Sequence, residues 1–205
     1  MDISDQTRQE RDRRQQIMEA ALRAFAERGF HKATIKEIAR EAGIKSSALI
    51  YWYFEDKDDL LHAVMAEFSP LLQQIIDPNA LMDRPPDEVL PLIAKALLDS
   101  YDDPALVQLL RVALSESVLN PEASSYFLRN AQKMVFDFFI AYLQHQIELG
   151  TLRPHDPQST ARSFFGTLVI YILSREIFPH FKTDLPDKEQ YVKDVVGIFL
   201  DGLRA

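Results

Sequence analysis

Cysteine is absent from the 205 residues of this chain. Without a thiol the protein can form no disulfide, use no thiolate nucleophile and hold no metal through cysteine, which agrees with a reducing cytoplasm. Glycine is scarce, with six residues, so little material exists for phosphate-cradling glycine loops. No apolar run reaches the length of a spanning helix, and the opening segment MDISDQTRQERDRRQQ has no apolar core. We therefore expect no membrane span, no signal peptide and a cytoplasmic location.

Positive charge is also in short supply, because 23 Lys and Arg residues face 31 Asp and Glu residues, for a net charge of −8. The shortage is uneven. Residues 8–53 hold ten basic and six acidic side chains, whereas residues 54–205 hold thirteen and twenty-three. A basic head on an acidic body could bind phosphates at one end only, which favours a nucleic-acid binder. Ordinary regional variation in an acidic protein is the alternative interpretation.

Residues 34–54, TIKEIAREAGIKSSALIYWYF, are expected to form two short helices joined by a turn. Thr34 and Glu37 have the spacing of a capping box, and apolar side chains then recur at helical intervals. Gly43 can close the first helix in the left-handed conformation. Ser46 or Ser47 can cap the second helix, which ends in three aromatic residues. A helix pair of this size is typical of a DNA reader.

The same stretch resembles the amino-terminal signature of the TetR family of dimeric, ligand-responsive transcriptional repressors. The matching residues lie between about 14 and 62: Gly29-Phe30, Thr34-Ile35, Glu37-Ile38-Ala39, Ala42-Gly43, Leu49, Tyr51, Tyr53-Phe54, Lys57 and Leu60. From Gly43 to Phe54 the chain is one residue longer than the commoner family form. The resemblance implies a dimer that binds a near-palindromic operator and is released by a small-molecule effector.

Strand-like alternation is missing from the whole chain, whereas helical spacing recurs throughout. Beyond the pair in residues 34–54, we expect helices at 11–28, 56–77, 87–101, 104–118, 122–149, 157–178 and 187–203. Residues 1–9 are expected to be a disordered lead, and residues 79–86 a loop. The prediction is an all-α fold with a three-helix helix-turn-helix DNA-binding domain at 1–55 and a larger helical domain at 56–205 for ligand binding and dimerisation.

The candidate DNA contacts are polar or aromatic side chains of this pair and its flanks. Those expected to hold phosphate are Thr34, Lys36, Tyr53 and Lys57, while Trp52 is expected to pack on the sugar-phosphate chain. The candidates for base edges are Lys45, Ser47, Ala48 and Tyr51, with Ser46 beside them. A tyrosine here could equally belong to the core of the domain, which is the expectation for Phe54. The cluster Arg8, Arg11, Arg13 and Arg14 could enter a minor groove or be a solvated helix start.

Aromatic side chains are concentrated in the carboxyl-terminal part, where they could line a cavity for an apolar or aromatic effector. The candidate pocket residues are Tyr101, Arg111, Phe127, Met134, Phe138, Tyr142, Phe165 and Tyr171. Plain core packing is the alternative for the aromatics, and a stem extended over apolar surface is the alternative for Arg111.

The segment FFGTLVIYIL, residues 164–173, is apolar almost all round, so each of its sides must be covered. We expect a homodimer through two helices of each chain. The candidate interface residues are Phe164, Gly166, Ile172, Val196, Phe199 and Leu203. A fully internal helix is the alternative.

The five histidines show no metal-ligand spacing, and no nucleophile elbow or zinc-protease helix occurs, so we expect neither a cofactor nor catalysis. An all-helical enzyme or carrier that uses the aromatic cavity is the alternative function, and a protein-binding helix pair is a third.

Overall fold

The computed structural model describes residues 3–75, 77–119 and 125–205, without the side chains of 3–7, 116–119, 125–132 and 179. Every regular element in these ranges is helical, as predicted, apart from an isolated antiparallel bridge between Leu152 and Arg204. The chain divides into two compact units. Unit 1 comprises Met1–Phe68 and Pro104–Leu128, and unit 2 comprises Ser69–Asp103 and Arg129–Ala205.

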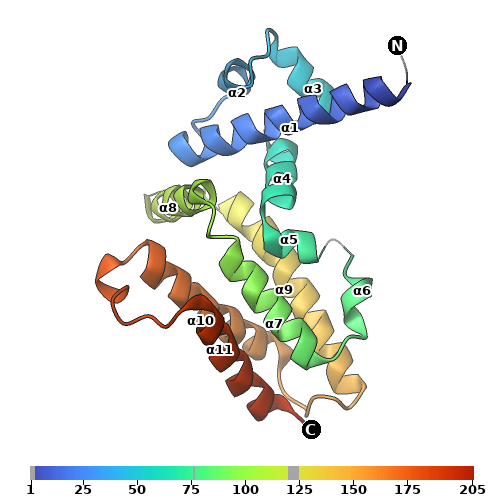
Figure 1. Cartoon of the computed structure of the whole chain (residues 1–205), viewed down its shortest axis with the longest axis vertical. Helices are drawn as coiled ribbons and strands as arrows, with labels where there is room; N and C mark the ends of the chain where they lie inside the picture. The colour runs from blue at the N-terminus through green and yellow to red at the C-terminus, as the bar shows by residue number, and fades with distance from the viewer. Residues whose placement is uncertain (1–2, 76, 120–124) are drawn as a thin grey trace. The chain divides into compact units, whose positions relative to one another are not determined.

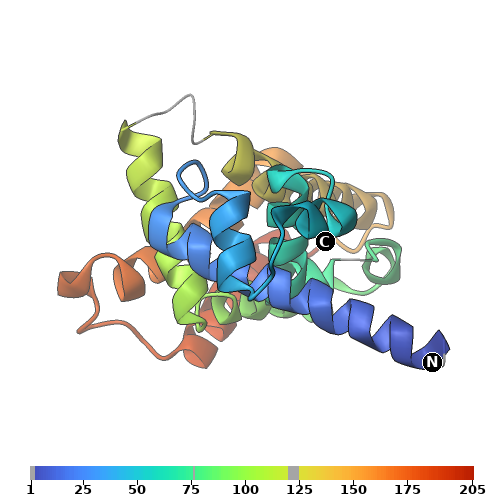
Figure 2. The ribbon, with the colours of Figure 1, turned by 90° about the horizontal axis from the view of Figure 1, so that it is seen from above.

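Unit 1 is built on its first helix. Its elements are α1 (Ile3–Arg28), α2 (Ile35–Glu41), the 3-10 turn η1 (Ser47–Leu49), α3 (Ile50–Tyr53), α4 (Lys57–Phe68) and α8 (Pro104–Leu119). Helix α1 packs against α2, α4 and α8 (Figure 1). Its amino-terminal end extends beyond the other helices of the unit (Figure 2). The core joins Phe25, Ile38, Ile50, Phe54 and Leu60, so it continues across residues 55/56, where the sequence places a domain boundary.

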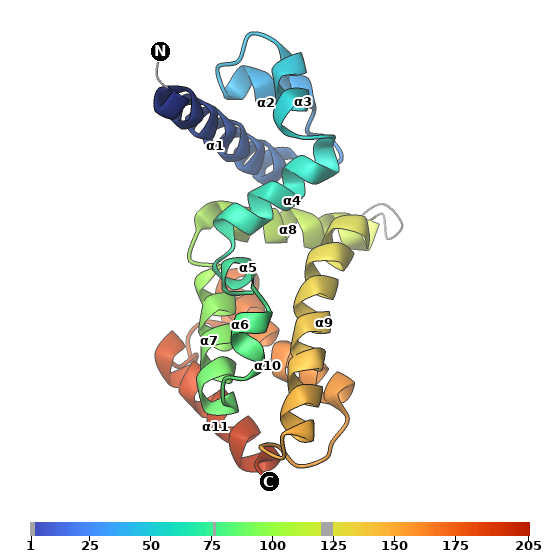
Figure 3. The same ribbon diagram turned by 90° about the vertical axis from the view of Figure 1, so that its right-hand side faces the viewer.

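Unit 2 is arranged around α7. Its elements are α5 (Pro70–Gln74), α6 (Asn79–Met82), α7 (Pro86–Asp99), most of α9 (Ser125–Glu148), α10 (Pro157–Glu176), η2 (Pro179–Phe181) and α11 (Lys188–Leu203). Helix α7 packs against α5, α10 and α11 (Figure 3). The carboxylates of Asp156 and Asp187 cap α10 and α11, accepting from the amides of Ser159 at 2.8 Å and Gln190 at 2.9 Å.

Three sequence-based expectations about the elements were wrong. Residues 3–9 are the first turns of α1 and no disordered lead, because a polar segment continuous with a packed helix can stay helical. The helix expected over 56–77 is two helices, α4 and α5, because Pro70 has no amide hydrogen and its ring blocks the preceding turn. Ser69, which is buried, caps α5 instead. The expected loop at 79–86 contains α6.

None of the helices in the described part of the chain combines the length and the apolar content needed to cross a membrane.

Candidate nucleic-acid interface

The start of α2 is a complete capping box. The Glu37 amide donates to Thr34 Oγ1 at 3.2 Å, while the Thr34 amide and hydroxyl donate to Glu37 Oε2 at 3.1 Å and 2.9 Å. These bonds from Thr34 lower the pKa of Glu37, and Arg28 pairs with the same carboxylate. The Thr34 hydroxyl, a predicted phosphate contact, is therefore already used inside the protein.

The second helix of the pair is short, capped at its start and anchored in the core by its buried side. Ser46 Oγ accepts from the Ala48 amide at 3.3 Å and starts η1, after which α3 follows directly. Ile50 and Phe54 are buried, and the core position predicted for Phe54 is confirmed. We call η1 and α3 together the reading helix. Its buried side fixes which side chains remain outside.

The exposed side of the reading helix is aromatic. Tyr51 is 55% exposed and Trp52 67% exposed, so neither belongs to the core. Tyr53 is half-buried and meets Trp52 edge to face, with the ring centroids 5.0 Å apart. Large apolar rings are costly to leave in water, and contiguous exposed ones mark interaction surfaces. This face can stack on a sugar-phosphate chain and present a phenolic hydroxyl to a groove.

The other predicted contacts on the pair are small or basic. Lys36, Lys45, Ser46 and Ala48 are exposed, and Ser47 is half-buried. The structure thus places two lysines, two serines and an alanine in the same two-helix segment as the exposed rings.

Lys57, a predicted phosphate contact, makes hydrogen bonds within the protein. Its side chain is half-buried, and Nζ donates to the carbonyl oxygens of Phe30 at 2.8 Å, Ala33 at 3.1 Å and His31 at 3.4 Å. A phosphate would have to compete with these three acceptors for the same ammonium group.

The arginine cluster at the start of the chain lies on α1. Arg8, Arg11 and Arg14 are exposed, and the Arg14 guanidinium lies 5.0 Å from the centroid of the Phe54 ring. Arg13 donates to Gln16 at 2.9 Å. It also lines an open groove of about 640 Å³ together with Gln9, Glu10, Asp12, Gln16, Leu49 and Tyr53. The two carboxylates offset the arginine, so this groove is not a strongly cationic site.

Several predicted pocket residues belong to a packed aromatic cluster in unit 2. Phe138, Tyr142 and Phe165 are buried, and Phe139 lies 5.1 Å from Phe165 and 5.0 Å from Phe164 between ring centroids. The Tyr142 hydroxyl donates to the Arg84 carbonyl at 2.8 Å, and burial raises its pKa. Ring-to-ring packing of this kind is typical of a protein core, which is the alternative interpretation given for these residues.

The remaining pocket candidates are dispersed. Tyr171 is buried and donates to the Pro186 carbonyl at 3.0 Å, and burial raises the pKa of Tyr101. Met134 is about half exposed, at 49%. Arg111 is an exposed residue of α8, in unit 1, whereas the described aromatic candidates for the pocket belong to unit 2. Phe127 lies outside the residues whose side chains are described.

Four of the predicted interface residues are buried inside the single chain. Phe164, Ile172, Val196 and Leu203 are buried within unit 2. Phe199 is half-buried and meets the Phe164 ring edge to face at 5.2 Å.

Other apolar side chains of α10 and α11, not among those predicted, are exposed. Val169 and Ile170 on α10 and Ile198 on α11 are exposed, the last by 71%. Gly166, which was predicted, is exposed beside them on α10, and apart from its neighbours along the helix no atom lies within 4 Å of the position a Cβ would take.

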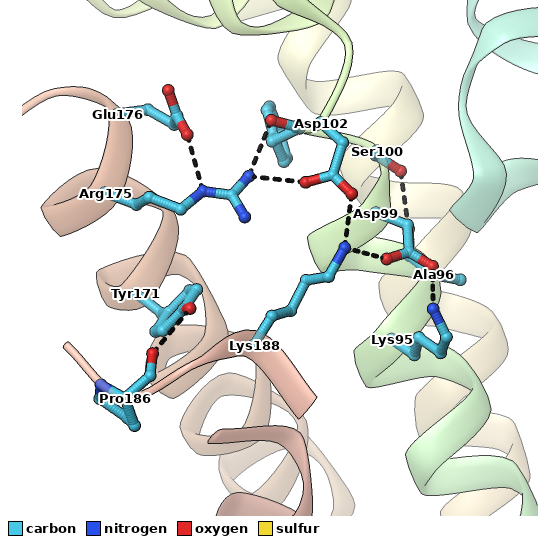
Figure 4. A network of polar contacts seen from close by, with 11 residues as sticks. Lys95, Ala96, Asp99, Ser100, Asp102, Tyr171, Arg175, Glu176, Pro186 and Lys188 are labelled. Carbon is cyan, nitrogen blue, oxygen red and sulfur yellow. Dashed lines mark hydrogen bonds and ion pairs between the residues drawn. The ribbon is translucent and has the colours of Figure 1, made fainter. Parts of the chain in front are cut away.

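Sequence reasoning missed a set of charged residues in unit 2. Lys188 at the start of α11 donates to the carboxylates of Asp99 and Asp102, at the end of α7 and in the turn after it (Figure 4). Arg175 of α10 donates to the Tyr101 carbonyl at 2.8 Å and pairs with Asp102 at 3.2 Å. We call these four charged residues the ion network. No sequence signal marks it, since its partners are far apart in the chain.

Comparison with known proteins gives matches over most of the chain. A family model described as bacterial regulatory proteins of the tetR family matches residues 17–64, and one described as AefR-like transcriptional repressor, C-terminal domain, matches residues 88–202. The HTH-type transcriptional regulator SrpR of Pseudomonas putida is 28% identical over 164 residues, 78% of this chain and 73% of that protein.

Solved structures share the fold. The fatty acid degradation regulator FadR from Bacillus halodurans superposes with a TM-score of 0.69 at 24% identity, over 93% of this chain and 99% of that one. SmeT, solved in complex with triclosan, superposes with a TM-score of 0.68 at 20% identity, over 95% of this chain and 92% of that one.

Proposed function

The chain belongs to the TetR family of transcriptional regulators, and from that premise we propose that it is a cytoplasmic repressor whose homodimer binds a near-palindromic operator. The observation that carries the proposal is the exposed aromatic face of the reading helix, on a buried and capped support. Tyr51 and Trp52 are held outside by the burial of Ile50 and Phe54 on the opposite side. A rigid support of this kind keeps base-contacting groups in register.

The proposed contacts divide by chemistry. Lys36 at α2 would hold phosphate, and Trp52 with Tyr53 would pack on the sugar-phosphate chain. Lys45, Ser47, Ala48 and Tyr51 would face base edges in the major groove. Thr34 and Ser46 would act chiefly as helix caps, since their side-chain oxygens already accept backbone amides.

The dimer would form through the exposed face of α10 and α11. Val169, Ile170 and Ile198 give an apolar surface there, and Gly166 would let a neighbouring backbone approach closely. A two-fold dimer would present its reading helices to successive major grooves, about 34–36 Å apart or a multiple of that spacing.

An apolar or aromatic small molecule is the proposed effector, and SmeT, which has this fold, was solved with triclosan. To shift the ratio of the non-binding form to the DNA-binding form from 1:99 to 99:1, the effector must bind the non-binding form more tightly by about 5.5 kcal/mol. The aromatic-rich part of unit 2, including Met134 and Phe138, is the proposed region for it. A carrier or enzyme that uses these aromatics has no observation in its favour beyond the aromatics themselves.

The proposal is tested by salt-titrated binding to DNA from upstream of the protein's own gene. We expect the dimer to prefer this DNA to a scrambled duplex of equal length, with affinity that falls as salt rises. Trp52→Ala should weaken binding, whereas Leu149→Ala, which removes an exposed apolar side chain in unit 2, should not. Equal binding to both duplexes at every salt concentration would contradict the proposal.

A further inference from the structure

Lys57, the first residue of α4, turns its ammonium group back onto the turn between α1 and α2. Nζ donates to three carbonyl oxygens of that turn, those of Phe30, His31 and Ala33, and lies 4.4 Å from the centroid of the Phe30 ring. A lysine ammonium has three N–H donors and no acceptor. The number of these carbonyls equals the number of donors that the ammonium offers.

The turn that Lys57 holds leads directly into the helix pair of residues 34–54. Gly29 begins it with φ +79°, and the Ala33 amide donates to the Gly29 carbonyl at 3.2 Å. Thr34, the next residue, is the cap of α2. At the other end, Lys57 follows the reading helix after only Phe54, Glu55 and Asp56. The ammonium thus links the turn before α2 to the first residue of α4. The helix pair of residues 34–54 lies between these two positions in the chain.

We infer that Lys57 is a positioning residue that closes the helix-turn-helix segment, and that it is no phosphate ligand. The inference rests on the proposed function for its DNA readout only. To reach a phosphate, the ammonium would have to give up charge-assisted bonds to carbonyls in a part-buried site, where an unpaired acceptor is costly. Its contribution to DNA binding comes from fixing where α2 starts and hence where the exposed rings of the reading helix lie.

Salt titration separates the two roles. Lys57→Met keeps the apolar stem and removes the charge, and Lys36→Met makes the same change at an exposed residue of α2. The logarithm of the affinity falls linearly with the logarithm of the salt concentration, and loss of one phosphate contact makes this decline less steep by about 0.9. We expect that change for Lys36→Met. For Lys57→Met we expect an unchanged slope with affinity lower by about tenfold at every salt concentration, the equivalent of one net hydrogen bond to a charged group. A drop of about 0.9 in the Lys57→Met slope would overturn the inference.

A second measurement needs no DNA. In the free protein, the amides of Ala33 and Thr34 should exchange with solvent about tenfold faster in Lys57→Met, because the turn opens more often. The amides of Leu61 and Val195, in α4 and in unit 2, should not change. Lys57→Arg, which restores N–H donors, should slow the exchange again. Unchanged exchange at Ala33 and Thr34 would overturn the inference, whether or not the protein binds DNA. Failure of the wild-type protein to bind any duplex would instead contradict the proposed function.

Discussion

The hydroxyl of Thr34 and the ammonium of Lys57 have the chemistry of phosphate ligands, and both are used inside unit 1. The pairing of Thr34 could be predicted, because its partner Glu37 is three residues away and the capping box is a local pattern. The pairing of Lys57 could not, because Phe30 is 27 residues earlier in the chain. Local hydrogen bonds can be read from spacing, whereas long-range ones depend on how the helices pack.

Thr34→Ala should lower the free energy of unfolding by about 1 kcal/mol, because the Glu37 amide loses its acceptor at the start of α2. Thr34→Ser keeps an oxygen at the same place and should stay near the wild-type value. Urea unfolding of the three proteins measures the difference. An alanine variant as stable as wild type would show that the box contributes nothing, and would return Thr34 to the set of candidate phosphate contacts.

At the scale of elements, the ion network joins the end of α7 to α10 and α11. Burial alone would raise the pKa of Asp99, but hydrogen bonds from Lys188 and Lys95 outweigh it and lower the pKa. Burial alone would lower the pKa of Lys188, but hydrogen bonds to Asp102 and Asp99 raise it. The carboxylate contribution to stability is therefore present at neutral pH and is lost as the pH falls through the lowered pKa of Asp99.

Lys188→Met should cost about 1–3 kcal/mol of unfolding free energy at pH 7, because two carboxylates lose a partly buried donor. The gap in unfolding free energy between variant and wild type should narrow as the pH falls through the lowered pKa of Asp99, below which this carboxyl is protonated in both proteins. Denaturant unfolding of both proteins at intervals from pH 7 to pH 3 measures this difference in unfolding free energy.

Lys95→Met is the matched control for this prediction. Among the described residues Lys95 pairs with Asp99, and its side chain is 60% exposed, so its removal should cost less than about 0.5 kcal/mol. A gap for Lys188→Met that stayed constant down to pH 3 would mean that packing of the lysine stem, and not its ion pairs, stabilises the contact.

At the scale of the whole molecule, the all-helical class and most helix positions follow from apolar spacing and from caps such as Thr34 and Asp187. The placement of α8 with α1 in unit 1 does not follow, because nothing local distinguishes Leu106 and Leu109 from core residues of unit 2. Nor does spacing alone tell which side of an almost wholly apolar helix faces outward. Phe164 and Ile172 of α10 are inside, while Val169 and Ile170 are outside.

Ile198→Glu tests the proposed dimer at its most exposed apolar residue. A carboxylate placed in an apolar contact between copies would lose its hydration, so we expect the variant to be a folded monomer. Operator affinity should fall by about 10²-fold or more, because the second half-site is no longer reached within one assembly. Ultracentrifugation and duplex binding measure the two effects.

Ile172→Val is the control on the buried side of α10. It should cost about 0.5–1.5 kcal/mol of stability and leave the assembly unchanged, since Ile172 packs within its own protomer. If Ile172→Val dissociated the protein while Ile198→Glu stayed dimeric, the interface would have to lie on another surface. The spacing of the two reading helices would then have to be set by that other contact.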